Sequence, residues 1–285
     1  MKEWLTFIRE RYSLITSIPF MLLFLLAHYA FSNSTLILNI QLVFIAIATW
    51  LFFLTLRLFD EIKDFETDKK SHPQRPLVRG LVKHVDLYKM ILGSVILEVF
   101  LLSTTGISAL VGILISILYS LFMFKEFFAR NWIRKHLTFY AVTHTFVSFL
   151  FSLTLFSAFT TTFLWSFSPR FYLFALINWL LFNVYEFGRK TFTTTEEQVS
   201  IDSYSKVFGV KGAVILLLSM AILITLLLFL TTSFMETFAS FILLPPLALV
   251  GFFYMLYNKD PWGKIYRVTS LVYIGLIYAI IIILK

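Results

Sequence analysis

The chain of 285 residues contains no cysteine, which excludes disulfides, thiolate metal sites and cysteine nucleophiles. Charged residues make up only 14% of the chain, whereas an ordinary soluble domain has about 25%. The sequence also lacks a GxGxxG motif, a Walker A motif and a pair of histidines at metal-binding spacing. Its first residues do not have the pattern of a cleavable signal peptide. These absences exclude a soluble globular protein and the common nucleotide sites.

Hydrophobic residues account for 59% of the chain, and most of them fall in apolar runs of about 20 residues, the length that spans a bilayer. In lipid such runs must be helical, because lipid offers no partner for backbone N–H and C=O groups. The sequence therefore predicts an all-α, multi-pass membrane protein that forms one domain over residues 1–285. Nine transmembrane helices are expected, near 12–31, 36–58, 87–103, 106–124, 137–160, 170–186, 212–231, 237–257 and 265–284.

The basic residues predict the orientation of these spans. Of the 24 Lys and Arg residues, 22 lie at the N-terminus or in connections on the same side of the membrane, and only Arg170 and Lys285 lie opposite. By the positive-inside rule, the N-terminus is cytoplasmic and the C-terminus is on the other side. The net charge of +8 is thus explained by the basic residues that orient the spans in the lipid bilayer. No segment indicates a nucleic acid or a protein partner.

The cytoplasmic segment 59–86 contains the clearest chemical pattern. Asp60, Asp64 and Asp68 are four residues apart, so on a helix that continues the second span they share one face. Three stacked carboxylates repel one another, and a divalent cation such as Mg²⁺ would relieve this repulsion. Arg75 offers a planar fork for phosphate, and the helix is expected to end near His72, before a proline. The alternative is a solvated helix end whose lysines pair with neighbouring acids.

This pattern, together with Arg75-Pro76 and Gly80, resembles the first signature of the UbiA superfamily of intramembrane prenyltransferases. Asp60 stands where that family more often has Asn. The resemblance covers essentially the whole chain and implies a bundle with a cytoplasm-facing cavity, Mg²⁺ as cofactor and a prenyl diphosphate as substrate. It makes the three aspartates the expected catalytic and metal-binding residues and Arg75 a diphosphate ligand.

The second half, segment 187–211, departs from the family pattern, because it contains no DxxxD motif. Glu186 is the first candidate for a metal-facing acid there, followed by Asp202 and then Glu197. Arg189 and Lys190 are expected to bind phosphate oxygens and so to replace part of a second metal site. Alternatively, these two residues only anchor the end of a span at the membrane surface.

Three further residues receive roles. Lys125 lies in a stretch that loosely resembles the YxxxK-type stretch of the family, which implies a diphosphate contact. His144 is an ionisable residue inside a predicted span, and it is expected to contact the acceptor. A neutral, hydrogen-bonded core histidine is the alternative for His144. Arg57 is the second candidate contact for the acceptor.

The expected function is Mg²⁺-dependent transfer of an isoprenyl group from its diphosphate to a lipophilic acceptor, expected to be aromatic. Two alternatives stay open at this point. One is a membrane terpene cyclase of the same superfamily, which the altered second motif suggests. The other is a transporter or lipid-binding protein that uses the acidic cluster for ion recognition. Neither the acceptor nor the length of the prenyl chain can be read from the sequence.

Overall fold

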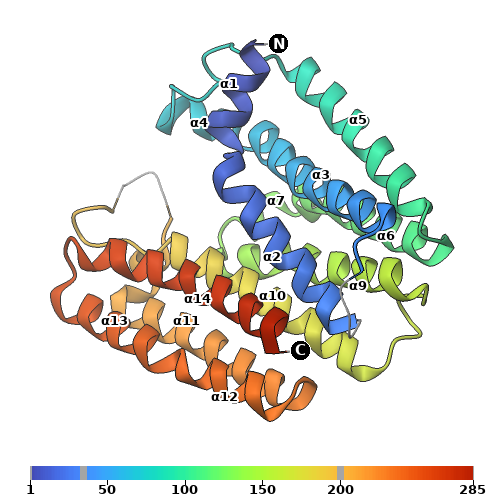
Figure 1. Ribbon diagram of the computed structural model, residues 1–285. Helices are drawn as coiled ribbons and strands as arrows, with labels where there is room; N and C mark the ends of the chain where they lie inside the picture. Colours follow the sequence, from blue (N-terminus) through green and yellow to red (C-terminus); the bar gives the residue numbers. More distant parts are fainter. Residues whose placement is uncertain (1, 33–36, 198–201, 285) are drawn as a thin grey trace. The chain divides into compact units, whose positions relative to one another are not determined.

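The computed structural model describes residues 2–32, 37–197 and 202–284 (Figure 1). Within these ranges all regular structure is helical, which confirms the predicted fold class. The α-helices of the first half are α1 (Lys2–Arg11), α2 (Leu14–Ser32), α3 (Ile40–Lys63), α4 (Phe65–Ser71), α5 (His84–Ser103) and α6 (Ile107–Phe124). Those that follow are α7 (Arg130–Ile133), α8 (Leu137–Thr145), α9 (Val147–Thr160), α10 (Pro169–Arg189), α11 (Tyr204–Thr231), α12 (Phe234–Ile242), α13 (Leu244–Tyr257) and α14 (Trp262–Leu284).

The chain forms two compact units. Unit 1 comprises residues 1–128 and 154–164, and unit 2 comprises residues 129–153 and 165–285. Helix α9 therefore contributes its first half to unit 2 and its second half to unit 1. That residues 1–285 act as a single domain stays a prediction.

Within the described ranges, eight helical segments are long and apolar enough to cross a membrane. They coincide with eight of the nine predicted spans. The remaining predicted span corresponds to α5, which is 20 residues long but carries Asp86, Lys89 and Glu98. The ninth span, at α5, stays a prediction.

Two of the long apolar segments are interrupted. The segment 137–160 changes from α8 to α9 at Phe146, and the segment 234–257 changes from α12 to α13 at Leu243. Two prolines explain the second interruption. Pro245 and Pro246 lie at the start of α13, and proline has no amide hydrogen to donate to the preceding turn of a continuing helix.

Helix α11 begins at Tyr204, earlier than the predicted start at 212. The two parts of this helix meet at Gly209, whose backbone has φ 70° and ψ 164°. Only glycine adopts this conformation without strain. The part before Gly209 is therefore set at an angle to the long apolar part. Because residues 204–211 include Ser205, Lys206 and Lys211, the apolar pattern marked only the later segment.

In unit 1, a row of small residues lets α6 approach α9. Four small residues are spaced four positions apart along α6, and all of them are buried: Ser108, Gly112, Ser116 and Ser120. The hydroxyls of Ser116 and Thr154 are 3.0 Å apart, and Ser108 donates a hydrogen bond to the carbonyl of Ser157. Small residues at this spacing are a recurrent device for close packing of membrane helices.

Also in unit 1, α3 packs against α5, and a polar contact lies inside this interface. The hydroxyl of Thr55 donates a hydrogen bond to Oε1 of the fully buried Glu98, at 2.6 Å. In unit 2, α10 packs against α11 and α14, and Tyr278 on α14 donates a hydrogen bond to the buried amide oxygen of Asn178, at 2.8 Å. Each unit thus holds a side-chain hydrogen bond inside a helix interface, although Oε2 of Glu98 has no hydrogen-bond partner among the described residues.

Replacing Gly112 with Leu is expected to destabilise unit 1. A Cβ atom at Gly112 would lie 3.1 Å from the backbone Cα of Thr154, which cannot move aside without shifting α9. We expect a cost of about 1–3 kcal/mol, typical of overpacking. The measurement is the thermal unfolding midpoint in detergent. Gly93→Leu on α5 is the control, because nothing lies within 4 Å of that position; equal midpoints for the two variants would contradict the prediction.

Candidate active site

The first aspartate motif lies where α3 passes into α4. Asp64 caps the end of α3 and begins α4 with φ −92° and ψ 2°. The amides of Asp64 and Asp68 nevertheless bond to the carbonyls four residues earlier, at 2.9 and 2.8 Å. The one-turn spacing of the three aspartates therefore continues through the junction. Helix α4 ends at Ser71 with His72 as its cap, which confirms the predicted end of the helix.

Each end of this aspartate row contacts basic residues. Asp60 pairs with Lys63 at 2.8 Å. Asp68 is buried and pairs with Arg75 through Oδ2, while Nδ1 of His72 lies 3.7 Å from Oδ1. The structure thus brings Arg75, the predicted diphosphate ligand, directly onto the last aspartate of the motif.

The donor set of this row suits Mg²⁺ held at an open site. Among the described residues, no group of three or more His, Asp or Glu side chains lies together in a way that could hold a metal ion. Mg²⁺ does not need such a group, because it is usually held by one or two carboxylates and completes its octahedron with water and substrate phosphate. Carboxylates presented on successive turns at the end of a span fit this mode of binding.

A buried ion cluster beside the motif was not foreseen. Glu61 is 2% exposed and contacts the guanidinium groups of Arg11 at 2.6 Å and Arg57 at 2.8 Å. Nε of Arg57 also donates to the backbone carbonyl of Arg11, at 2.9 Å. The cluster ties the end of α1 to α3 at the residue that follows Asp60. Arg57, predicted to contact the acceptor, is engaged here; the only sequence signal for the cluster was the i,i+4 spacing of Arg57 and Glu61.

A second pair strengthens the link between α1 and the motif segment. Nη2 of Arg79, in the connection after α4, lies 2.9 Å from Oε1 of Glu10 on α1. Both side chains are partly exposed, so this pair contributes little stability by itself. It does hold α1 against the connection that carries Arg75.

In unit 2, the end of α10 carries a second ion cluster. Glu186 is buried, and its Oε2 accepts hydrogen bonds from Arg189, with Nε and Nη2 both at 2.6 Å. Its Oε1 lies 2.9 Å from Nζ of Lys190. Two predicted phosphate-binding cations and the predicted metal-facing acid therefore form one group. The acid is matched by two positive charges, which leaves the group cationic.

The other second-half acids have different surroundings. Asp202 is exposed. Glu197 accepts hydrogen bonds from Ser203 and Ser205, both at 2.6 Å. The predicted metal-binding roles of these residues stay predictions, and their contacts show that the described second-half acids are not gathered around one point.

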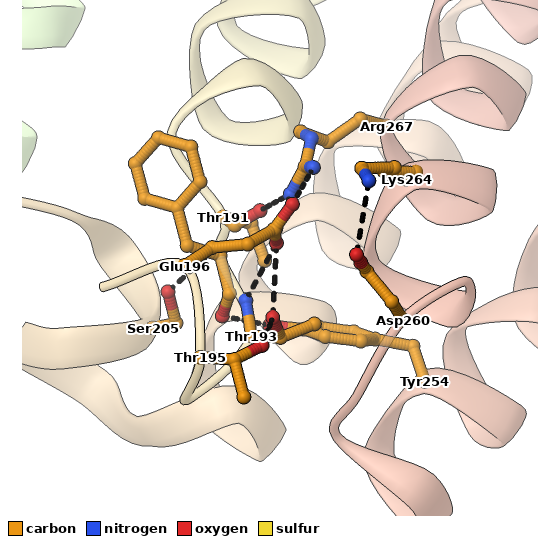
Figure 2. Close-up of polar contacts among 10 residues, drawn as sticks. Thr191, Thr193, Thr195, Glu196, Ser205, Tyr254, Asp260, Lys264 and Arg267 are labelled. Atoms are coloured by element: carbon orange, nitrogen blue, oxygen red, sulfur yellow. Dashed lines mark hydrogen bonds and ion pairs between the residues drawn. The ribbon is translucent and has the colours of Figure 1, made fainter.

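Glu196 accepts hydrogen bonds from Arg267 and Thr193 in unit 2 (Figure 2). Arg267 on α14 donates from Nη1 to Oε2 at 2.9 Å and from Nη2 to Oε1 at 2.5 Å. The hydrogen bond from Arg267 lowers the pKa of the Glu196 carboxyl from 4.5 to about 2, assisted by the backbone amide of Thr193 and opposed by burial. Neither Glu196 nor Arg267 was selected from the sequence, because an acid and an arginine 71 residues apart carry no local signal.

The two remaining predicted residues lie at different places. Lys125 caps the end of α6, is exposed, and has its ammonium 5.3 Å from the centre of the Phe124 ring. The next three residues, 126–128, have positive φ values of 49°, 51° and 57°, which is strained for residues other than glycine. His144 on α8 is half-buried, with Nδ1 2.8 Å from the carbonyl of Tyr140.

Comparison with known proteins decides the family. The model of the UbiA prenyltransferase family matches residues 16–277 of this chain. The chain belongs to the UbiA prenyltransferase family. The match includes both motif segments, so the departure of the second motif occurs within the family. No curated protein matches the chain.

Solved structures of UbiA proteins share the fold at low sequence identity. A UbiA homologue from Aeropyrum pernix K1 in its apo form superposes with a TM-score of 0.67 and 15% identity, covering 93% of this chain and 97% of that one. A digeranylgeranylglyceryl phosphate synthase gives 0.66 and 14%, with 99% and 98% covered. A UbiA homologue from Archaeoglobus fulgidus bound to DMAPP and Mg²⁺ gives 0.59 and 12%, with 99% of both chains covered.

Replacing Glu61 with Ala is expected to destabilise the UbiA fold of this chain strongly. The change leaves Arg11 and Arg57 close together without their shared carboxylate, and breaking a buried pair in this way costs about 3 kcal/mol or more. The thermal unfolding midpoint measures the effect. Glu66→Ala is the control, because the Glu66–Lys69 pair is exposed; a similar loss in both variants would show that the cluster adds no special stability.

The Glu196–Arg267 pair predicts a dependence of stability on pH. A carboxyl whose pKa is 4.5 when unfolded and about 2 when folded stabilises the fold above pH 4.5, and this contribution disappears as the pH falls toward 2. The difference in unfolding midpoint between the wild type and Glu196→Gln should therefore be constant near neutral pH and shrink in acid. A constant difference at all pH values would contradict this account.

Proposed function

We propose that this chain catalyses Mg²⁺-dependent transfer of an isoprenyl group from a prenyl diphosphate to a lipophilic acceptor, expected to be aromatic, at the cytoplasmic edge of the membrane. The observation that carries the proposal is the aspartate row at the α3–α4 junction, in a chain that belongs to the UbiA prenyltransferase family. Similar structures bound to DMAPP and Mg²⁺ and to GPP and Mg²⁺ support it.

In this proposal Asp60, Asp64 and Asp68 hold Mg²⁺. When bound, the metal neutralises the oxygens of the diphosphate, which is otherwise a poor leaving group. Arg75 contributes a charge-assisted hydrogen bond to the same oxygens, and its contact with Asp68 sets its position. Charge that develops on the diphosphate as the C–O bond breaks is therefore met by groups already in place.

The cations of the second half are proposed to bind the diphosphate directly. Arg189 and Lys190 keep a net positive charge after pairing with Glu186, and Lys125 is a further candidate. The allylic cation left by the departing diphosphate is stabilised by aromatic faces. Tyr140, against which Lys190 lies at 5.7 Å from the ring centre, shows that aromatic side chains occur beside these cations. His144, next to Tyr140, and Arg57 remain the proposed acceptor contacts.

The membrane orientation belongs to the same proposal. The eight apolar helices and the family make this an integral, multi-pass membrane protein. The positive-inside pattern supports a cytoplasmic N-terminus and active site, with the C-terminus on the opposite side. A charged diphosphate would then approach from the cytosol while its prenyl chain enters the apolar bundle.

Replacing Asp64 with Ala, or Asp68 with Ala, is expected to reduce Mg²⁺-dependent turnover of prenyl diphosphates by about 100-fold or more, the scale of losing an electrostatic group that acts in the transition state. Diphosphate release by the purified protein in liposomes, with candidate acceptors, is the measurement. Glu66→Ala, an exposed acid on α4, is the control and should keep its activity. Full activity in both aspartate variants would refute the site.

The same assay separates the alternatives. Incubation without any acceptor should leave the prenyl diphosphate intact if the protein is a transferase. A cyclic hydrocarbon product would instead establish a terpene cyclase. Ion or lipid flux in proteoliposomes, with no diphosphate released, would establish a transporter.

A further inference from the structure

The segment that follows the second-half cations is hydrogen-bonded to α13, to the residue that caps α13 and to α14. Figure 2 shows the contacts of Thr191 and Glu196 with Arg267. Arg267 on α14 donates from Nη1 to the carbonyl of Thr191, at 2.9 Å, in addition to its two bonds with Glu196. Tyr254 on α13 donates to the carbonyl of Phe192, at 2.5 Å. The hydroxyl of Thr194 donates to the carbonyl of Asn258, at 3.3 Å. These bonds fix the path of the chain beginning one residue after Lys190.

Glu196 also forms hydrogen bonds within this segment. Its Oε2 accepts hydrogen bonds from the amide of Thr193 at 3.0 Å and from the hydroxyl of Thr193 at 3.1 Å, besides the one from Nη1 of Arg267. Thr191 and Thr193 are both buried. The carboxylate therefore joins the guanidinium on α14 to the backbone of the segment, and a planar arginine fork is the group that fits such a two-oxygen contact.

The backbone on the other side of Lys190 is fixed as well. The carbonyl of Lys190 accepts a hydrogen bond from the amide of Tyr204, at 2.9 Å, and the amide of Thr191 bonds to the carbonyl of Gly188, at 3.2 Å. Lys190 itself ends α10 with φ −103° and ψ 27°. These bonds hold the backbone of Lys190 in one place, and from there its side chain extends to Glu186.

From these contacts we propose that Glu196 and Arg267 are positioning residues. They hold the segment Thr191–Glu197 so that Arg189 and Lys190 present their charges to the diphosphate. The inference rests on the proposed function, and it deepens that function by giving the second half a support that needs no second carboxylate pair. In it, an arginine–glutamate fork and a threonine-rich turn set the geometry of a cationic diphosphate site.

The test is a double-mutant cycle between Glu196→Gln and Lys190→Ala. Glu196→Gln keeps the size of the side chain but loses the charge that Arg267 and Thr193 bind. We expect about a tenfold or larger rise in KM for the prenyl diphosphate and in Kd for inorganic diphosphate, with a smaller change in kcat, on the scale of a lost charge-assisted hydrogen bond. In the Lys190→Ala background the same substitution should have little further effect on either constant, because the cation it positions is gone.

Two further variants keep the test decisive. Thr193→Val removes only one hydroxyl donor and should shift KM in the same direction by less. Lys264→Ala is the control: Lys264 lies on the same helix as Arg267, and its pair with Asp260 is exposed, at 2.9 Å. It should leave KM unchanged. If Glu196→Gln does not fold, Thr193→Val carries the cycle with Lys190→Ala.

Distinct outcomes separate this inference from the proposed function. Equal rises in KM and Kd for Glu196→Gln with and without Lys190, or a lower unfolding midpoint with unchanged KM and Kd, would overturn the positioning role. The wild-type protein could bind inorganic diphosphate but turn over no prenyl diphosphate. If Glu196→Gln then raises the Kd for inorganic diphosphate only when Lys190 is present, the proposed function is overturned and the positioning role is supported. No binding of diphosphate at all would overturn both.

Discussion

An ionised group at the edge of an apolar bundle is costly unless it finds a partner within the chain, and this cost governs where the few charges of this protein lie. In unit 1, Glu61 is shared by two arginines at the end of α3. In unit 2, Glu186 is shared by Arg189 and Lys190 at the end of α10. Both clusters occur where a long apolar helix ends, since only there can cations reach a buried carboxylate while their stems stay in apolar surroundings.

The same constraint gives the helix ends their chemistry. A prenyl diphosphate has an apolar chain and a highly charged head, so a protein that binds it needs charge next to an apolar interior. The aspartate row on α3 and α4 supplies negative charge for a metal, and Arg75 is set against it. The end of α10 carries two cations, Arg189 and Lys190, which the proposed function assigns to the phosphate oxygens.

Under the proposed function, the second half of this UbiA protein supports the site without the usual aspartate pair. Its buried acid is neutralised by cations, and another acid, Glu196, is used to fix the backbone. Interactions of this kind depend on geometry rather than on metal binding. The bidentate contact with Arg267 and the two bonds from Thr193 fix the turn at several points at once, so each bond is made with little further loss of conformational freedom.

Much of the fold and part of the site could be predicted from the sequence, because both depend on short periodicities. Apolar runs marked the long helices, and the proline after His72 marked the end of α4. The four-residue spacing of Asp60, Asp64 and Asp68 placed them one turn apart, and the backbone bonds through the α3–α4 junction agree. Such features are local, since a helix repeats every few residues.

Only the tertiary structure decided which distant charges meet. Arg11 and Glu61 are 50 residues apart, and Glu196 and Arg267 are 71 residues apart. No spacing rule connects such residues, because their contact depends on how whole helices pack. The sequence by itself therefore determined a multi-pass helical membrane protein and its first aspartate row. The packing of α1 on α3, and of the segment after α10 on α14, decided which ion pairs hold the motif segments in place.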